Sequence, residues 1–189
     1  MKKPLVIGSL ILLILIIPPI RIYMESIMII HMLIQLPLLI VVGWFIGEFL
    51  MDKAPRVFEL LNDNGIPGII VFVAITMFWM LPRTLDEALT FPLYELFKFI
   101  SLPLVGILLV DSWRKIKVFG RVFIFLNYLS MFGLMGWLYL DSPIQICNNY
   151  LLAQQKILGW GFIFITALMV MYVLQYVFTD HSAEEDISE

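Results

Sequence analysis

Charge and cysteine are scarce in this chain of 189 residues. Asp, Glu, Lys and Arg make up 14% of it and hydrophobic residues 61%, whereas a soluble domain is typically about 25% charged. Cys147 is the only cysteine, so no intrachain disulfide can form. A nucleic-acid motif and a basic patch are also lacking, and we expect no nucleic-acid partner. The composition excludes an ordinary soluble domain and indicates a polytopic membrane protein in contact with lipid.

Motifs for catalysis and for metal binding are lacking as well. The chain has no Ser-His-Asp set, no phosphate-binding loop and no metallohydrolase spacing, so we do not expect an enzyme. It has no His-x-x-x-His or Cys-x-x-Cys pair, which would have been a specific sign of a metal site. It also has no convincing internal repeat, which makes a transporter built from two matching halves the weakest hypothesis.

Long hydrophobic runs dominate the chain, and they are continuous rather than alternating. This pattern predicts an all-α fold, a polytopic transmembrane helix bundle of about six helices, rather than a β-barrel. We expect residues 1–180 to form a single transmembrane domain and residues 181–189 to form an acidic cytoplasmic tail. The predicted membrane segments are residues 4–20, 27–51, 66–81, 93–113, 118–140 and 151–178.

Prolines interrupt three of these segments. Pro18 and Pro19 are expected to close the first one, because proline cannot continue a helix without the loss of a backbone hydrogen bond. Pro37 and Pro103 lie inside the second and fourth segments and are candidate kink sites. The first segment has a basic start and no small-x-small cleavage site, which favours a retained helix over a cleaved signal peptide.

The distribution of Lys and Arg predicts the orientation of the chain. Cytoplasmic loops of membrane proteins carry an excess of these residues. With six spans, one side holds Lys2, Lys3, Lys53, Arg56, Arg114, Lys115, Lys117 and Arg121, and the other holds Arg21 and Arg83, with Lys98 and Lys156 just inside helix ends. We therefore expect a multi-pass protein of the inner membrane with both termini cytoplasmic.

Polar residues at membrane depth fall almost entirely in the outer half of this topology. The inner halves are plain apolar sequence apart from Asn127. Such residues mark a functional site by default, so we expect a pocket or a partner surface that opens outward. Capping of helices and hydrogen bonds between helices are the simpler roles for the amides. The predicted outer polar cluster consists of Gln35, Asp86, Lys98, Asn148, Asn149, Gln154 and Gln155.

Two ion pairs are expected near this cluster. Glu95 and Lys98 are three residues apart on one helical face and are able to pair with each other. Asp86 has Lys98 or Arg83 as its candidate partner. Neither pair by itself implies more than a structural role.

Methionines and a histidine share one face of the second segment. Met24, Met28, His31 and Gln35 recur at spacings of four, three and four residues. Thioether and imidazole groups suit copper, thioether especially Cu(I). One interpretation is a transient copper site of His31 with Met28 or Met24, completed by Met80 or Cys147. The other, favoured by spacing alone, is that methionine fills gaps in the bundle while the histidine bonds to a neighbouring helix.

Three stretches of the chain resemble the CtaG-type cytochrome c oxidase assembly factors, a family of polytopic bacterial membrane proteins. The stretches are HMLIQLPLLIVVGW, FWMLPRTLDEALTFPLYELFKFISLPLVGILLVDSW and CNNYLLAQQKILGW, and the likeness extends over residues 30–161. The matching positions are His31, Trp79 with Pro82, and Ala153-Gln154-Gln155. Family members carry a second histidine where this chain has Gln35, and further histidines near the positions of Leu81 and 97–99. They are also longer, so the chain resembles a short, divergent branch.

The resemblance implies a function in maturing or supporting a haem-copper respiratory oxidase, whose subunits would be the partners. Copper handling at the outer face is one form of that role. The alternative is a small structural subunit or docking partner of a larger membrane complex, with no metal of its own. A channel or transporter is the least favoured reading.

Overall fold

The computed structural model describes residues 3–178, which form helices joined by short turns and one longer loop, with no strand among them. The prediction of an all-α bundle is confirmed. Four helices are long and apolar enough to cross a membrane, or up to six if each of two bent pairs counts as one span. The helices are thus compatible with a multi-pass membrane protein. The predicted acidic tail lies outside the described residues.

The four long helices agree closely with the predicted segments. One is a continuous rod of 26 residues made of α3 (Met28–Ile30), the π-helical turn η1 (His31–Gln35) and α4 (Leu36–Lys53). The other three are α8 (Pro92–Lys115), α9 (Val118–Asp141) and α10 (Leu152–Phe178). α8 runs unbroken through Pro103.

The remaining segments are bent. The axis of α1 (Lys3–Ile16) meets that of α2 (Pro18–Ser26) at 72°, and α5 (Pro55–Leu61) meets α6 (Ile66–Met80) at 79°. The prediction that the first segment runs to residue 20 is therefore wrong. Pro18 opens α2 instead, because its fixed φ and missing N–H suit the first turn of a new helix. α7 (Pro82–Thr90) also begins with proline and links α6 to α8.

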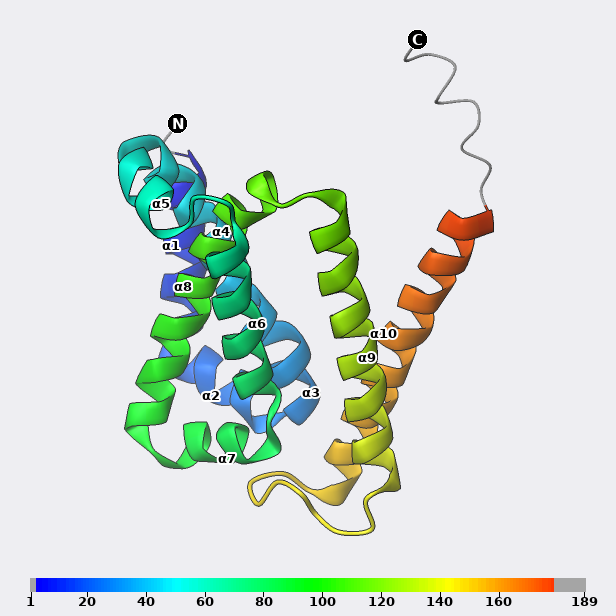
Figure 1. Ribbon diagram of the computed structural model, residues 1–189. Helices are drawn as coiled ribbons and strands as arrows, with labels where there is room; N and C mark the ends of the chain where they lie inside the picture. The colour runs from blue at the N-terminus through cyan, green and yellow to red at the C-terminus, as the bar shows by residue number, and fades with distance from the viewer. Residues whose placement is uncertain (1–2, 179–189) are drawn as a thin grey trace.

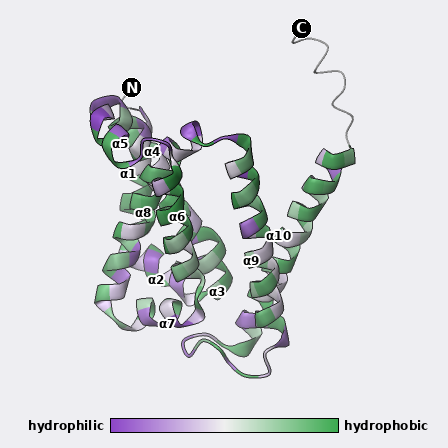
Figure 2. Ribbon diagram, in the orientation of Figure 1, coloured by the Kyte–Doolittle hydropathy of each residue, from purple (hydrophilic) through white to green (hydrophobic). Residues whose placement is uncertain are grey.

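α4 and α8 form the centre of the bundle, with α1 packed on α4 and α6 packed on α8 (Figure 1). α9 and α10 form an antiparallel hairpin beside this group, and α10 contacts α3. One end of the molecule carries α7 and the loop of residues 142–151, and we call it the α7 end. The opposite end carries α5 and the link of residues 116–117, and we call it the α5 end. Figure 2 shows hydrophobic residues along the long helices and hydrophilic ones concentrated at α5, α2 and α7.

The crossing of α4 and α8 brings two backbones into contact. A Cβ atom on Gly43 would overlap the carbonyl group of Pro103, and one on Gly106 would overlap the carbonyl oxygen of Ile40. Small residues at such a crossing allow the close van der Waals packing that holds membrane helices together. This crossing fixes α8, and with it Lys98, against the π-helical turn that precedes α4.

Candidate functional site

A π-helical turn places three polar or sulfur-bearing side chains inside the bundle. In η1 the N–H of Leu36 donates to the carbonyl of His31, five residues back rather than four. Pro37 follows and has no N–H to donate, so the irregularity predicted at this proline is present in the turn before it. His31, Met32 and Gln35 are all buried here. Single π-turns inside α-helices occur frequently at functional sites.

The ring of His31 is held on both sides. Its Nδ1 lies 2.8 Å from the hydroxyl of Tyr150, and its Nε2 lies 3.3 Å from Nζ of Lys98. The Tyr150 hydroxyl donates its own hydrogen to the carbonyl of Glu25 at 2.7 Å. Assigning hydrogens from these partners, Nδ1–H of His31 donates to Tyr150, and Nε2 accepts from the Lys98 ammonium. The imidazole is therefore neutral.

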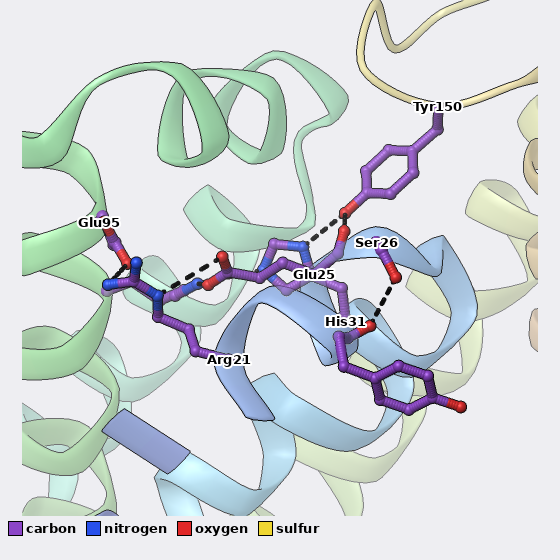
Figure 3. A network of polar contacts seen from close by, with 8 residues as sticks. Arg21, Glu25, Ser26, His31, Glu95 and Tyr150 are labelled. Carbon is purple, nitrogen blue, oxygen red and sulfur yellow. Dashed lines mark hydrogen bonds and ion pairs between the residues drawn. The ribbon is translucent and has the colours of Figure 1, made fainter. Parts of the chain in front are cut away.

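Lys98 is the charged centre of the site and is fully buried. Its ammonium donates to Oε1 of Glu25 at 2.5 Å and lies 5.1 Å from the centre of the Phe99 ring. Glu25 is also 4.0 Å from Arg21, and Arg21 forms a second ion pair with Glu95 (Figure 3). Two acidic and two basic groups thus alternate along one chain of contacts. Opposite charges that pair in this way reduce the large cost of burying each of them.

The expected pairing of Glu95 with Lys98 is wrong. Each of them pairs with a residue of α2 instead, Glu95 with Arg21 and Lys98 with Glu25. The bend of 72° between α1 and α2 lets α2 fold back on the bundle, which brings these partners within reach. We call the set Arg21, Glu25, His31, Glu95, Lys98 and Tyr150 the buried ion network, after its buried members His31, Lys98 and Tyr150; the other three side chains are partly exposed.

Asp86 holds the loop of residues 142–151 on α7, so its expected pairing with Lys98 or Arg83 is also wrong. Its carboxylate accepts from the backbone N–H groups of Asn148 at 2.6 Å and Asn149 at 3.2 Å, and from the Asn149 side-chain amide at 3.3 Å. Arg83 pairs with Glu87 at 3.0 Å. Their hydrogen bond lowers the pKa of Glu87 and raises that of Arg83.

Gln154 and Gln155 connect the loop and α10 to neighbouring elements. Oε1 of Gln154 accepts from the N–H of Met28 at 3.1 Å, where α3 begins. Oε1 of Gln155 accepts from the N–H of Ile146 at 2.9 Å. These contacts give both amides the capping and inter-element roles of the simpler prediction.

Gln35 differs from the other members of the predicted cluster. It is fully buried, and among the described residues neither Oε1 nor Nε2 of its side chain has a hydrogen-bond partner. An unsatisfied buried polar group costs about 1–3 kcal/mol. Gln35 therefore shares the turn with His31 but is not joined to the buried ion network.

Cys147 is buried beside α7. Its Sγ lies 3.8 Å from the carbonyl oxygen of Pro82. Burial, and secondarily the charge of Asp86, raises the pKa of its thiol to about 12. Burial, and secondarily the charge of Glu25, also raises the pKa of Tyr150 above its ordinary value. Cys147 is thus a protonated, weakly reactive thiol at neutral pH.

The structure places the residues of the predicted copper set close together but engages the histidine elsewhere. Met24, Met28 and Met32 are buried in one core, against which Met80 packs. Both ring nitrogens of His31 are already engaged, and one faces a cation, which repels a metal ion. Within residues 3–178 no group of three or more His, Cys, Asp or Glu side chains is arranged to hold a metal. The copper site stays a prediction, and the contacts of His31 argue against it.

A second polar cluster lies at the α5 end, so the prediction that the inner halves are plain apolar is wrong. Asn62 is buried and donates to Asp111 at 2.6 Å and to the hydroxyl of Ser112 at 2.8 Å. Its Oδ1 accepts from the N–H of Gly68 at 2.8 Å. Lys115 closes the cluster through Asp111 at 2.9 Å. These bonds fix the turn between α5 and α6 against the end of α8.

Arg21, Glu25 and Tyr150 are site residues that the sequence prediction missed. Arg21 and Glu25 are four residues apart in a mainly apolar stretch, and Glu95 and Lys98 offer the complementary charges. That balance of two acidic and two basic groups was the feature of the sequence from which the ion pairs could have been predicted. The position of Tyr150 depends on the conformation of the loop alone, so the spacing of residues along the chain could not predict it.

Fold and site together define an α-helical bundle, compatible with a multi-pass membrane protein, with charged side chains paired in its interior. Compared with protein-family models, with curated proteins and with solved structures, the chain has no match. The likeness to the CtaG-type family thus depends on the quoted residues alone.

Proposed function

We propose that this protein is an accessory or assembly factor of a haem-copper respiratory oxidase, and that it works by binding a partner at its α7 end rather than by carrying copper. The observation that carries the proposal is a preformed polar hollow at that end. The hollow has a volume of about 490 Å³ between α7 and the loop of residues 142–151. It is lined by Arg83, Asp86, Glu87, Thr90, Phe91, Ile146, Asn148 and Asn149.

The rim of the hollow offers groups that suit a protein partner. The side chain of Arg83 is 89% exposed, and Phe91 is 54% exposed beside it. Arginine and aromatic residues are enriched where protein interfaces gain most of their affinity. The side-chain amide of Asn149, which bonds to Asp86 and to the Thr90 hydroxyl, adds a polar anchor on the opposite wall.

The walls of the hollow are fixed before any partner arrives. Asp86 ties the loop to α7, Gln155 ties the loop to α10, and Tyr150 ties it to His31 and Glu25. A surface that needs no ordering on binding gives more affinity for the same contacts. The buried ion network therefore stabilises the loop that forms one wall of the docking surface. This role accounts for the pairing of its members with one another.

The basic residues support an outward-facing hollow. Lys53, Arg56, Arg114, Lys115 and Lys117 all belong to the α5 end or to the span ends next to it. By the positive-inside rule this end is cytoplasmic, and the α7 end lies outside the inner membrane. The resemblance to the CtaG-type factors supplies the identity of the partner, an oxidase assembled in the same membrane.

The experiment is co-purification of the tagged protein with oxidase subunits, combined with an oxidase activity assay on membranes. We expect the R83E variant to reduce both co-purification and activity while the variant itself accumulates normally, because its side chain is exposed. The matched control is R114E, an exposed arginine at the opposite end. Equal recovery of oxidase subunits with wild type and R83E would refute the proposed docking surface.

Copper handling is the second candidate, favoured by the burial of Met24, Met28 and Met32 in one core with the His31 turn. It is tested by titration of the purified protein with Cu(I) against a competing chelator, with H31A measured beside wild type. Saturable binding that H31A abolishes would support a copper site. The docking proposal expects no such binding in wild type.

A further inference from the structure

An apolar groove at the α5 end lies between α6 and the start of α9. One part of it, about 210 Å³, is lined almost wholly by aliphatic and aromatic groups. A second part of about 540 Å³ shares Ile66, Ile116, Phe119 and Gly120 with the first, so the two are continuous. The second part also includes Lys115 and Lys117 together with Asp63 and Asn64. The groove thus has an apolar interior and a charged mouth.

Its depth in the bundle matches the edge of the hydrocarbon region. The span of α8 ends at Lys115 and the span of α9 begins at Val118. The mouth therefore lies at the level of lipid headgroups, and Ile69, Ile70, Phe123 and Ile124 line the groove farther along α6 and α9. α6 and α9 meet farther along, where the Thr76 and Tyr128 hydroxyls are hydrogen-bonded and the rings of Phe72 and Tyr128 lie 5.8 Å apart. That contact closes the groove.

Positive charge exceeds negative charge at the mouth. Lys115 forms an ion pair with Asp111 and donates a hydrogen bond to the carbonyl of Asn62. Arg121 donates to the carbonyl of Trp113 and lies over its ring. Lys117 is exposed on the link between α8 and α9. Asp63 is the acidic residue in the lining. The basic groups flanking the groove are Arg114, Lys115, Lys117 and Arg121.

We propose that this groove binds one anionic phospholipid, with an acyl chain between α6 and α9 and its phosphate beside Lys117. Basic pockets between membrane helices on the cytoplasmic side bind the headgroups of anionic lipids. The apolar interior accounts for the acyl chain, and the charge at the mouth accounts for a preference over a zwitterionic lipid. The lipid would join α9 to α6 where the two helices leave space between them.

Native mass spectrometry of the delipidated full-length protein tests this assignment. The probes are palmitoyl-oleoyl phosphatidylglycerol (POPG) and phosphatidylcholine (POPC). We expect a one-to-one adduct with POPG at a concentration roughly fivefold lower than with POPC, since one basic residue near an anionic surface is worth about that factor. The K117Q variant should lose this preference, whereas R56Q, which removes a charge at the same end outside the groove, should retain it.

A variant that fills the groove provides an independent test of the proposal. Gly120 lines both parts of it, and a Cβ there would meet only Ile116 at ordinary distances of 3.5 and 3.9 Å. G120L should therefore fold and should weaken the binding of both lipids, while V122L on an exposed face of α9 should not. Equal affinity of wild type for the two lipids, unchanged binding by G120L, or a dimer of the chain that excludes lipid from the groove would overturn the proposal.

Discussion

Lys98 shows how a single residue depends on partners from distant parts of the chain. Its ammonium has no contact with water and lies between Glu25 and the neutral ring of His31. Burying an ammonium costs several kcal/mol unless a counter-ion compensates for it. Hydropathy and spacing predict that Lys98 is unusual, but they do not predict its partner, because Glu25 reaches it only through the fold of α2.

Replacing one member of this pair should be worse than replacing both. K98M leaves the Glu25 carboxylate with Arg21 as its remaining ionic partner, and we expect a loss of about 3 kcal/mol in the free energy of unfolding. The double variant K98M/E25Q removes both charges and should recover part of that loss. The measurement is an unfolding titration in mild detergent with SDS. Additive losses in the double variant would show that the two side chains do not interact.

Cys147 gives a second prediction at the scale of one residue. Since the pKa of its thiol is raised to about 12, the thiolate that reacts with maleimides is nearly absent in the folded protein at about pH 7.5. We expect negligible labelling of the native protein and complete labelling after denaturation. Mass spectrometry of the intact protein measures both. Rapid native labelling would mean that the loop of residues 142–151 is open.

Helices are the scale at which sequence and structure agree best. Apolar length predicts the four long spans to within a few residues, since 20 or more apolar residues have few other stable arrangements. The bends between helices could not be predicted in the same way. α2, α5 and α7 are short and mixed in character, and the hydrophobic pattern does not reveal that α2 folds back. The π-turn at His31 changes the backbone register by one residue, and the segment that follows is too uniformly apolar to reveal the resulting rotation of its side chains.

The crossing of α4 and α8 should not tolerate an added methyl group. In G43A the Cβ would overlap the Pro103 carbonyl, so the helices must separate, and we expect a loss of about 1–3 kcal/mol. The matched control is G133A in α9, where the new Cβ would lie 3.5 Å from the Thr166 side chain. Unfolding in detergent is again the measurement. Equal stability of the two variants would contradict the close approach of the backbones.

The whole molecule has two different polar ends, whereas the sequence predicts a polar cluster at only one of them. The buried ion network and the polar hollow gather at the α7 end, and the Asn62 cluster gathers at the α5 end. The existence of a polar cluster at the α7 end could be anticipated from the sequence, because the residues concerned are rare at membrane depth. The contacts among these residues could not be predicted, because the loop of residues 142–151 positions Asn148, Asn149 and Tyr150 without any periodic pattern.

The orientation of the two ends can be measured directly. In a C147A background, we expect R83C to react with a membrane-impermeant maleimide added to intact cells, and K117C to react only after the membrane is opened. Both side chains are exposed, so accessibility depends on the side of the membrane alone. The reverse pattern would invert the topology and place the polar hollow in the cytoplasm.

The wide sequence separations in the buried ion network have a consequence for biosynthesis. Glu25 bonds to Lys98, 73 residues later, and His31 bonds to Tyr150, 119 residues later. During synthesis, which proceeds from the N-terminus, α2 therefore leaves the ribosome well before Glu95, Lys98 and Tyr150 exist. Until then, Arg21 and Glu25 have each other as ionic partners but lack Glu95 and Lys98. The hydrogen bonds of Glu25 and His31 to Tyr150 must wait for the loop after α9, so the complete packing of α2 is a late step that an incomplete chain cannot perform.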